Sequence, residues 1–214
     1  MVRRTKEDAL ATRHSLLDAA ERVFSEKGVS RSSLNDIAVA AGTTRGAIYW
    51  HFKDKADLFN AMMERVTLPM EEALEQMGRE PGRDPLEDMR QSAVDVLRKM
   101  VNDPVVQRVF EVASYKVEYV GDALPIKQRH LEARNGCLAE MTRSLQAAAD
   151  LHRCALPMTA AMAAQGLHAI VDGLIQNWLL SPHEFDVVST GQQAIDTFLA
   201  GLGFPRPAPQ AQAI

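Results

Sequence analysis

Residues 43–59 read TTRGAIYWHFKDKADLF, and this stretch decides how the N-terminal part of the chain is interpreted. Its two threonines can cap a short helix that begins at Arg45. Just before it, Gly42 ends another short helix, which starts at Ser33 with Asp36 three positions later in a capping-box pattern. Two short helices joined by a tight glycine-containing turn are typical of a helix-turn-helix, although a generic three-helix packing unit has the same outline.

A longer helix is expected before this pair. Apolar residues recur at three- and four-residue steps from Leu10 to Phe24, and Gly28 stands where a C-cap glycine would end the helix. Residues 1–60 carry 10 Lys and Arg against 8 Asp and Glu, whereas the whole chain has a net charge of -4. This asymmetry indicates that the N-terminal part is the one that meets a polyanion.

The rest of the chain also predicts helices, because no alternating run of β-branched residues suggests a strand. Pro69 is expected to kink or break the helix that begins near Asp54. Further helices are expected over residues 85–101, 104–115, 126–149, 159–180 and 189–201. The tail, residues 205–214, contains three prolines and is expected to be disordered. The fold class is therefore all-α.

Several classes of protein are disfavoured by patterns that are missing. The chain contains no run of 18 apolar residues, and its N-terminus has no apolar stretch of the signal-peptide type. We therefore expect no membrane span and a cytoplasmic protein. Cys137 and Cys154 are interpreted as core packing, and no Cys/His spacing suggests a metal or cofactor site. No phosphate-binding, nucleophile-elbow or HExxH motif is present, so a helical enzyme is the less favoured alternative.

Residues 43–59 closely resemble the recognition-helix signature of the TetR family, and residues 16–42, LLDAAERVFSEKGVSRSSLNDIAVAAG, resemble the two helices before it. The arm MVRRTKE and residues 171–182, VDGLIQNWLLSP, further resemble multidrug-efflux repressors of the AcrR and TtgR kind. The resemblance implies a homodimer of about nine helices per chain. It has a three-helix DNA-binding head, residues 1–53, and a ligand-binding and dimerisation domain, residues 54–204.

The resemblance also implies which head residues touch DNA. Arg45 is the preferred base reader because its guanidinium can bond guanine O6 and N7 together; a phosphate contact is its alternative. The small Gly46 and Ala47 allow close approach, while Ile48 and Phe52 point inward. The full predicted set is Arg3, Arg4, Ser33, Thr44, Arg45, Gly46, Ala47, Tyr49, Trp50, His51 and Lys55.

Most of the remaining residues of this set are expected at phosphates. Tyr49, His51 and Lys55 match family positions that contact the phosphate backbone. Trp50 is expected to pack against the first helix rather than to line the DNA backbone. The basic arm reaches an adjacent groove or phosphates, or else forms a solvated tail. Ser33 can donate to phosphate, and Thr44 can contact phosphate or base, while each also caps its helix.

The last two predicted helices carry apolar residues on more than one face. This favours a four-helix interface between protomers, with a central helix buried within one protomer as the alternative. The apolar residues are Leu167, Ile170, Leu174, Trp178, Ile195, Phe198 and Leu202. Gly166, Ala169 and Gly173 would permit close helix approach.

The resemblance places an effector pocket in the body, with an apolar lining and a few polar groups. The corresponding positions hold Met89, Val96, Phe110, Glu111, Ser114, Cys137, Met141, His168, Val171 and Asp172. Thr67 departs from the acid that AcrR-like proteins place there, and Phe110 and Ser114 depart from TtgR-like proteins, so no drug class is carried over. Glu111 and Asp172 can serve a cationic or hydroxyl-bearing ligand, or can be surface carboxylates.

We therefore expect a repressor of multidrug efflux pump genes that a hydrophobic small molecule releases from a palindromic operator. A regulator of other metabolic genes and a DNA-binding protein without an effector are the alternatives within the DNA-binding class.

Overall fold

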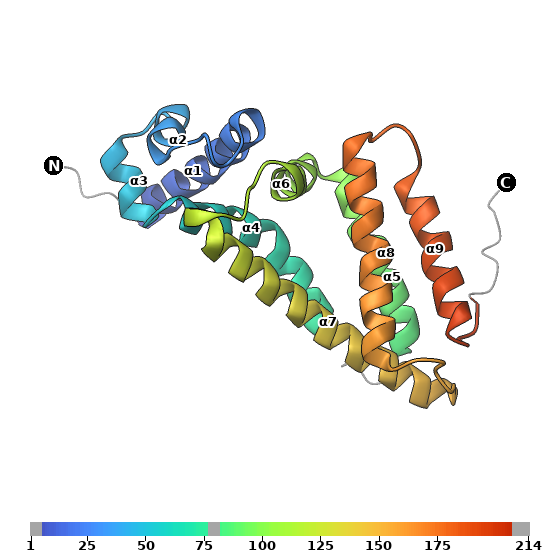
Figure 1. The fold of residues 1–214 in the computed structure, drawn as a ribbon. Coiled ribbons are helices and arrows are strands. Elements are labelled where there is room, and N and C mark those ends of the chain that lie inside the picture. The colour runs from blue at the N-terminus through green and yellow to red at the C-terminus, as the bar shows by residue number, and fades with distance from the viewer. Residues whose placement is uncertain (1–5, 77–81, 207–214) are drawn as a thin grey trace. The chain divides into compact units, whose positions relative to one another are not determined.

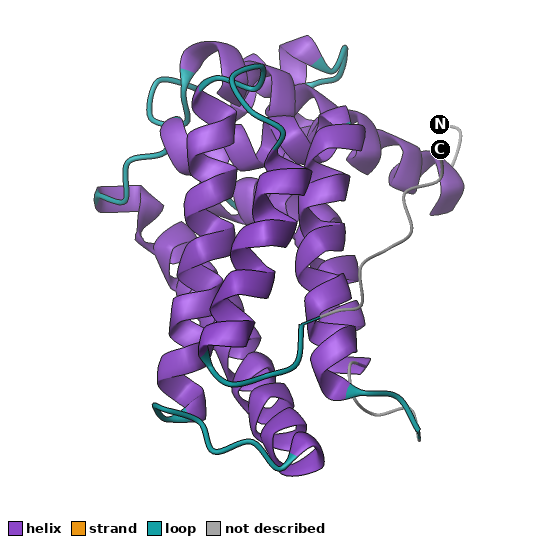
Figure 2. Ribbon diagram, turned by 90° about the vertical axis from the view of Figure 1, so that its right-hand side faces the viewer, coloured by secondary structure: helices purple, strands orange, loops and turns teal. Residues whose placement is uncertain are grey.

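The computed structural model describes residues 6–76 and 82–206, and all regular structure within these ranges is helical (Figures 1 and 2). The elements are α1 (Lys6–Lys27), α2 (Leu34–Ala40), α3 (Arg45–His51), α4 (Lys55–Gln76), α5 (Pro85–Asn102), α6 (Pro104–Tyr115), the 3-10 turn η1 (Gly121–Ala123), α7 (Leu124–His152), α8 (Ala160–Leu180) and α9 (Val187–Gly201). The predicted all-α fold with about nine helices is confirmed over the described residues. None of these helices combines the length and apolarity that a membrane crossing requires.

Side-chain caps explain where the later helices begin. The Asp84 carboxylate accepts the Leu86 N–H at 2.9 Å and starts α5. The Asp186 carboxylate accepts two backbone N–H groups at 3.0 and 3.1 Å, so α9 begins at Val187, two residues before the predicted start. An Asp at the N-cap satisfies N–H groups that have no partner within the helix.

Two prolines behave differently from the prediction. Of the kink or break expected at Pro69, the break is wrong, because α4 is assigned without interruption from Lys55 to Gln76, and the kink remains a prediction. Pro125 was expected to precede α7 but lies inside its first turn, since α7 begins at Leu124. A first-turn proline lacks only an N–H group that the helix leaves unbonded in any case. Pro69 removes one bond of a 22-residue helix, and the others persist.

The described chain divides into two compact units. The first unit comprises residues 6–69 and 104–133, and the second comprises residues 70–76, 82–103 and 134–206. The helices α4 and α7 each contribute residues to both units. The predicted boundary between residues 53 and 54 falls within the first unit and remains a prediction about function.

The core of the first unit forms where α1 packs against α2 and α6. Phe24 on α1 and Phe59 on α4 are buried with ring centroids 5.9 Å apart. Ile37 on α2 and Ile48 on α3 are fully buried. In Figure 1, α2 and α3 lie beside α1 in the N-terminal, blue part of the chain. This packing anchors the two short helices that alone would be too short to be stable.

The second unit is built around α5, α8 and α9, which pack on one another. Leu97, Leu167 and Ile195 are fully buried there. At Gly191 on α9, an added Cβ atom would lie 2.1 Å from Leu97 Cδ1, so a larger residue there would force the buried Leu97 side chain to move. Arg90 is buried and forms an ion pair with Asp196, with Nε and Oδ1 2.7 Å apart.

Candidate DNA-binding site and effector cavity

Local hydrogen bonds define the two helices that follow α1. Ser33 Oγ accepts the Asp36 N–H at 3.1 Å, and the Asp36 carboxylate accepts the Ser33 N–H at 2.9 Å, so the predicted capping box is confirmed. Thr44 Oγ1 accepts the Ala47 N–H at 3.2 Å and caps α3. Between the helices Gly42 has a φ of +66°, a conformation that favours glycine. Together these features produce a helix-turn-helix.

The Asp36 carboxylate is stabilised in its ionised form. Hydrogen bonds from the Ser33 hydroxyl and backbone N–H, followed by Lys27, lower the pKa of Asp36. The Ser33 hydroxyl donates to Asp36 Oδ2 at 2.6 Å, and Lys27 Nζ lies 3.3 Å from Oδ1. A phosphate contact from Ser33 must therefore compete with a charge-assisted bond within the protein.

The helix α3 has a buried and an exposed side. Ile48 is fully buried and Phe52 is 2% exposed, which confirms that both point inward. Arg45, Gly46 and Tyr49 are exposed. The Arg45 guanidinium carbon lies 5.5 Å from the Tyr49 ring centroid, within the range of a cation–π contact. The helix α3 thus presents a cation and a phenol to solvent.

The predicted packing of Trp50 against the first helix is wrong. Its side chain is 74% exposed, and its ring meets the His51 ring edge-on with centroids 4.6 Å apart. Trp50 follows the buried Ile48 by two residues, which is about 200° around a helix and therefore on the opposite side. Its place among the DNA-facing residues remains a prediction.

His51 and Phe52 close the end of α3. Their rings lie 6.2 Å apart, and the Arg13 guanidinium of α1 covers the Phe52 ring at 5.3 Å. These contacts fix the half-buried imidazole against the first unit. The predicted phosphate contact of His51 is not tested by them.

The side chain of Lys55, the first residue of α4, binds the backbone of the loop between α1 and α2. Its ammonium donates to the backbone carbonyls of Val29 at 2.7 Å, Ser32 at 3.0 Å and Ser30 at 3.2 Å. The structure thus places it at the loop between α1 and α2. Its predicted phosphate contact remains untested. Arg3 and Arg4 lie outside the described residues.

One buried carboxylate joins α1 to two other helices. The Glu21 side chain is 4% exposed and accepts from Arg65 Nη2 of α4 at 3.1 Å and from Arg108 Nε of α6. Arg65 Nη1 also reaches Asp18 at 2.5 Å. A buried carboxylate is stable only with such partners, so this cluster holds the three helices together.

A small cavity of about 50 Å³ lies within the first unit between α4, α6 and α7. Phe59, Met63 and Ile126 form part of its apolar lining. Glu64 on α4 and Arg129 on α7 add an ion pair with Oε1 and Nε 3.1 Å apart. Drug-sized ligands occupy pockets of roughly 300–1,000 Å³, so this cavity must widen to hold one.

Further polar groups surround the same cavity. Tyr119 and His130 both line it, with ring centroids 6.3 Å apart, and burial raises the pKa of Tyr119. Thr67, the residue that replaces an expected acid, also lines it, and the acid Glu64 stands one turn earlier on α4. The cavity therefore has an apolar lining with both a carboxylate and a guanidinium at its wall.

Comparison with known proteins assigns both parts of the chain to one family. Residues 16–62 match the profile of bacterial regulatory proteins of the tetR family, and residues 84–204 match the C-terminal region of MAATS-type transcriptional repressors. The chain belongs to the tetR family. The predicted membership is thereby confirmed, and the protein is a transcriptional regulator with a helix-turn-helix.

Three similar proteins illustrate the relationship. The HTH-type transcriptional repressor BepR of Brucella suis biovar 1 is 39% identical over 98% of this chain and 100% of its own. Native NalD, the secondary repressor of the MexAB-OprM multidrug efflux pump in Pseudomonas aeruginosa, has a TM-score of 0.84 at 31% identity, covering 91% of this chain and 98% of its own. A complex of SmeT with triclosan has a TM-score of 0.81 at 32% identity, covering 94% and 100%.

Ten effector-binding residues were carried over from tetR-family repressors, and three of them lie on α6 in the first unit. Phe110 and Glu111 are half-buried and Ser114 is exposed. None of the ten lines the cavity between α4, α6 and α7. Sequence reasoning missed that cavity, although Asn60, Glu64 and Thr67 form a polar stripe at helical spacing along α4.

The other seven effector candidates lie in the second unit. Met89 and Met141 are buried, with exposed fractions of 1% and 6%. Asp172 is exposed and accepts from Gln176 Nε2 at 2.7 Å, as a surface carboxylate does. The half-buried members are Val96, Cys137, His168 and Val171. Their role as a tetR-family effector pocket remains a prediction.

The two cysteines are half-buried, which corrects their interpretation as core residues. Cys137 Sγ lies 3.7 Å from Met141 Sδ, and burial, with the charge of Glu71, raises the pKa of the Cys137 thiol to about 11. Cys154 Sγ donates to the Leu202 carbonyl at 3.4 Å. Cys137 lies on α7 and Cys154 in the loop after it, and neither residue is fully buried.

Proposed function

We propose that this protein is a dimeric repressor of multidrug efflux genes that a hydrophobic small molecule releases from a palindromic operator. The observation that carries the proposal is the exposed pair of Arg45 and Tyr49 on α3. The efflux-gene target is supported by NalD, described as a repressor of an efflux pump, and by SmeT, described as the repressor of the pump SmeDEF of Stenotrophomonas maltophilia.

The recognition helix enters the major groove with its N-terminal end toward the bases. Arg45 then reads a guanine, and Tyr49 and the capping residues contact phosphates. One seven-residue helix supplies few contacts. A second head about 34–36 Å away, one turn of DNA, doubles them and requires a two-fold symmetric site.

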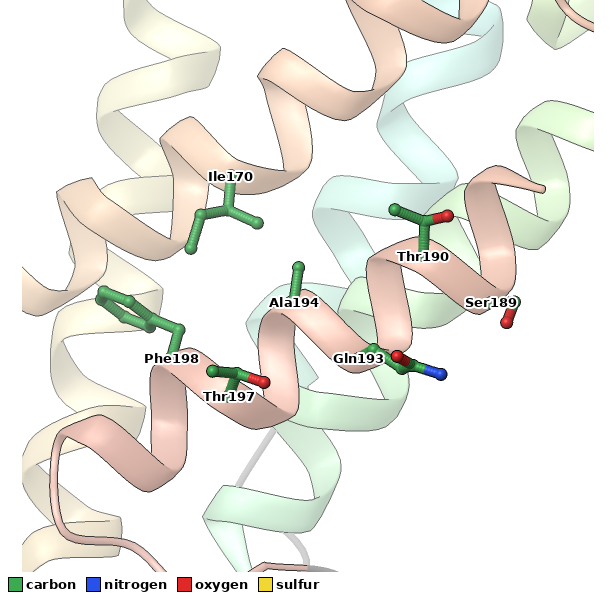
Figure 3. A pocket seen from close by; sticks show the side chains of 7 residues that line it. All are labelled: Ile170, Ser189, Thr190, Gln193, Ala194, Thr197 and Phe198. Carbon is green, nitrogen blue, oxygen red and sulfur yellow. The ribbon is translucent and has the colours of Figure 1, made fainter. Parts of the chain in front are cut away.

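An open groove on α8 and α9 supports the dimer. It measures about 600 Å³ and includes Ile170 of α8 and Ala194 and Phe198 of α9. Figure 3 shows Ile170 facing the helix that carries the other two residues. Ile170 and Phe198 remain half-exposed in the single chain, so a partner helix would remove apolar surface from water.

Part of the sequence-based interface was assigned too broadly. Leu167, Trp178, Ile195 and Leu202 are buried within the second unit itself, as the alternative of a buried central helix predicted. Leu174 is half-buried, like Ile170 and Phe198. The proposed interface therefore uses the outer side of α8 and α9 and leaves the inner side to the protomer's own core.

The proposed effector is an apolar molecule with a polar group. The triclosan complex of SmeT shows that a related protein takes such a compound. In this chain the Glu64–Arg129 pair and the apolar side chains around it offer a binding site once the cavity widens. Widening would move α4 or α6, and Glu21 links both of these helices to α1.

The proposal is tested by measuring binding to the intergenic DNA beside the gene at several salt concentrations, with and without a panel of hydrophobic drugs. We expect saturable, salt-dependent binding to a palindromic site that one drug abolishes. Specific binding that no compound in a broad panel disturbs contradicts the effector proposal. Binding to a single half-site by a monomer contradicts the dimer.

A further inference from the structure

The ammonium group of Lys55 occupies a cage of backbone carbonyls. Its three hydrogens have three acceptors, the carbonyl oxygens of Val29, Ser30 and Ser32, at 2.7, 3.2 and 3.0 Å. An ammonium group has three donors and no acceptor. The loop between α1 and α2 thus satisfies the whole donor capacity of this lysine.

The same loop is held from a second side by α6. The Val29 N–H donates to the Lys116 carbonyl at 2.8 Å, and Val29 is 2% exposed. The Val29 carbonyl therefore accepts from Lys55, the first residue of α4, and the Val29 N–H donates to Lys116, the residue after α6. A further bond from Ser32 Oγ to the Gly28 carbonyl, 2.7 Å long, closes the loop on itself.

This loop leads directly into the DNA-facing helices. Ser33, the next residue, is the N-cap of α2, and its position depends on the carbonyls that Lys55 collects immediately before it. Three carbonyls that converge on one point repel each other unless a cation lies between them. Without the ammonium group, the three carbonyls move apart, and Ser33 at the start of α2 moves with them.

We propose that Lys55 is a positioning residue for operator binding: it holds the Val29–Ser33 loop, and with it α2 and α3, in the DNA-binding geometry and makes no phosphate contact itself. The inference rests on the proposed function for its effect on DNA. The effect of Lys55 on the loop between α1 and α2 does not depend on DNA. A phosphate contact would require the ammonium to give up at least one of its carbonyl partners.

Arginine distinguishes the two roles. A guanidinium binds phosphate at least as well as an ammonium does, but its planar fork cannot direct three hydrogens to one convergent set of carbonyls. Lys55→Arg therefore restores a phosphate contact and does not restore the carbonyl cage. Lys55→Met keeps an aliphatic side chain of similar size and removes both the phosphate contact and the hydrogen bonds to the carbonyls. Lys53→Met, which changes an exposed lysine two residues earlier, is the matched control.

The first measurement is hydrogen exchange of backbone amides in the free protein. In Lys55→Met and Lys55→Arg we expect the amides of Val29, Ser32 and Asp36 to exchange roughly tenfold faster or more, with unchanged rates in Lys53→Met. Unchanged protection of these amides in Lys55→Met overturns the inference. This readout stands even if no operator is found.

The second measurement is operator affinity as a function of salt. We expect both Lys55 variants to bind about tenfold more weakly than the parent, with the parental slope of log K against log salt retained in Lys55→Met as well as in Lys55→Arg. A phosphate contact predicts near-parental affinity for Lys55→Arg and a slope lower by about 0.9 per protomer in Lys55→Met. That pattern overturns the inference, whereas failure of the parent protein to bind any operator overturns only the proposed function.

Discussion

The helix-turn-helix of the first unit and the α8–α9 pair of the second are both two-helix arrangements, but they are held together differently. In the helix-turn-helix, Ser33 and Thr44 bond backbone N–H groups three residues away. In the α8–α9 pair, close packing dominates, since an added Cβ on Gly166 of α8 would lie 2.8 Å from the Phe198 ring of α9.

The difference explains why the two regions tolerate different changes. Local caps contribute modestly to stability but set the geometry of a DNA-facing surface. A packed helix pair depends on volume, and a single methyl group can disturb it. Substitutions in the first region are therefore expected to affect function more than stability, and the reverse is expected in the second region.

The largest functional effect is expected for Arg45→Ala. Loss of a bidentate base contact in both heads of a dimer is expected to weaken specific operator binding by roughly a hundredfold or more, because each such contact is worth about 1–3 kcal/mol. Fluorescence anisotropy with labelled operator measures this effect. Arg98→Ala, which changes an exposed arginine of α5, is the control. An unchanged melting temperature together with lost binding supports the functional reading, whereas retained binding contradicts it.

The largest effect on stability in the first unit is expected for Glu21→Gln. The variant leaves Arg65 and Arg108 facing an amide in place of a carboxylate. We expect a loss of about 2 kcal/mol, below the range for fully buried pairs because both guanidinium groups are partly exposed. Urea unfolding measures it, with Glu26→Gln as the exposed control on the same helix. Equal stability of the two variants would argue against the role of Glu21.

Packing in the second unit is tested by Gly191→Ala. The added methyl group meets Leu97 Cδ1 at 2.1 Å, so the unit is expected to lose roughly 1–3 kcal/mol. Gly201→Ala lies near the end of the same helix, where nothing approaches within 4 Å, and is expected to be neutral or stabilising. The melting temperatures of the two variants test this expectation, and equal melting temperatures would contradict the close-packing explanation.

The two regions are compared directly by removing one threonine cap from each. Thr44→Ala and Thr159→Ala both remove the side-chain acceptor at a helix start and are each expected to lower stability by about 1 kcal/mol. Operator affinity is expected to fall only for Thr44→Ala. Equal losses of affinity in the two variants would remove the distinction between the regions.

The smallest effect concerns pH. Because the pKa of Asp36 is lowered in the folded protein, its contribution is present above the unfolded pKa and disappears as the pH falls through the lower folded value. Asp36→Asn is expected to be less stable than the parent at neutral pH, and the gap is expected to close in acid below the usual aspartate value of 3.8. Urea titrations at several pH values test this, with the exposed Asp122→Asn as control. A gap that does not change with pH contradicts the role of the carboxylate.

The sequence predicted best what depends on neighbours within a few residues. The capping box at Ser33, the cap at Thr44 and the inward direction of Ile48 follow from spacing and helix geometry, and all three are confirmed. The expected packing of Trp50 against the first helix was wrong, because its position two residues after Ile48 places it on the opposite side of α3. The uninterrupted course of α4 through Pro69 could not be predicted from a local rule against proline.

Features that join distant segments were not visible in the sequence. Glu21 and Arg108 are 87 residues apart, and Lys55 lies 26 residues from the Val29 carbonyl that it binds. No periodicity links such positions, so the carbonyl cage and the buried carboxylate appear only once the chain is folded. The same holds for the pairing of Glu64 with Arg129 beside the cavity.

The raised pKa of the Cys137 thiol determines how this side chain reacts with oxidants and electrophiles in the cell. With a pKa of about 11, only about one molecule in ten thousand carries a thiolate at this position at neutral pH. Peroxides and electrophiles react with thiolates, so they leave this side chain largely untouched. If the proposed effector contacts Cys137, it is bound through its shape and polarity rather than by reaction with the thiol, so its release leaves the side chain unmodified.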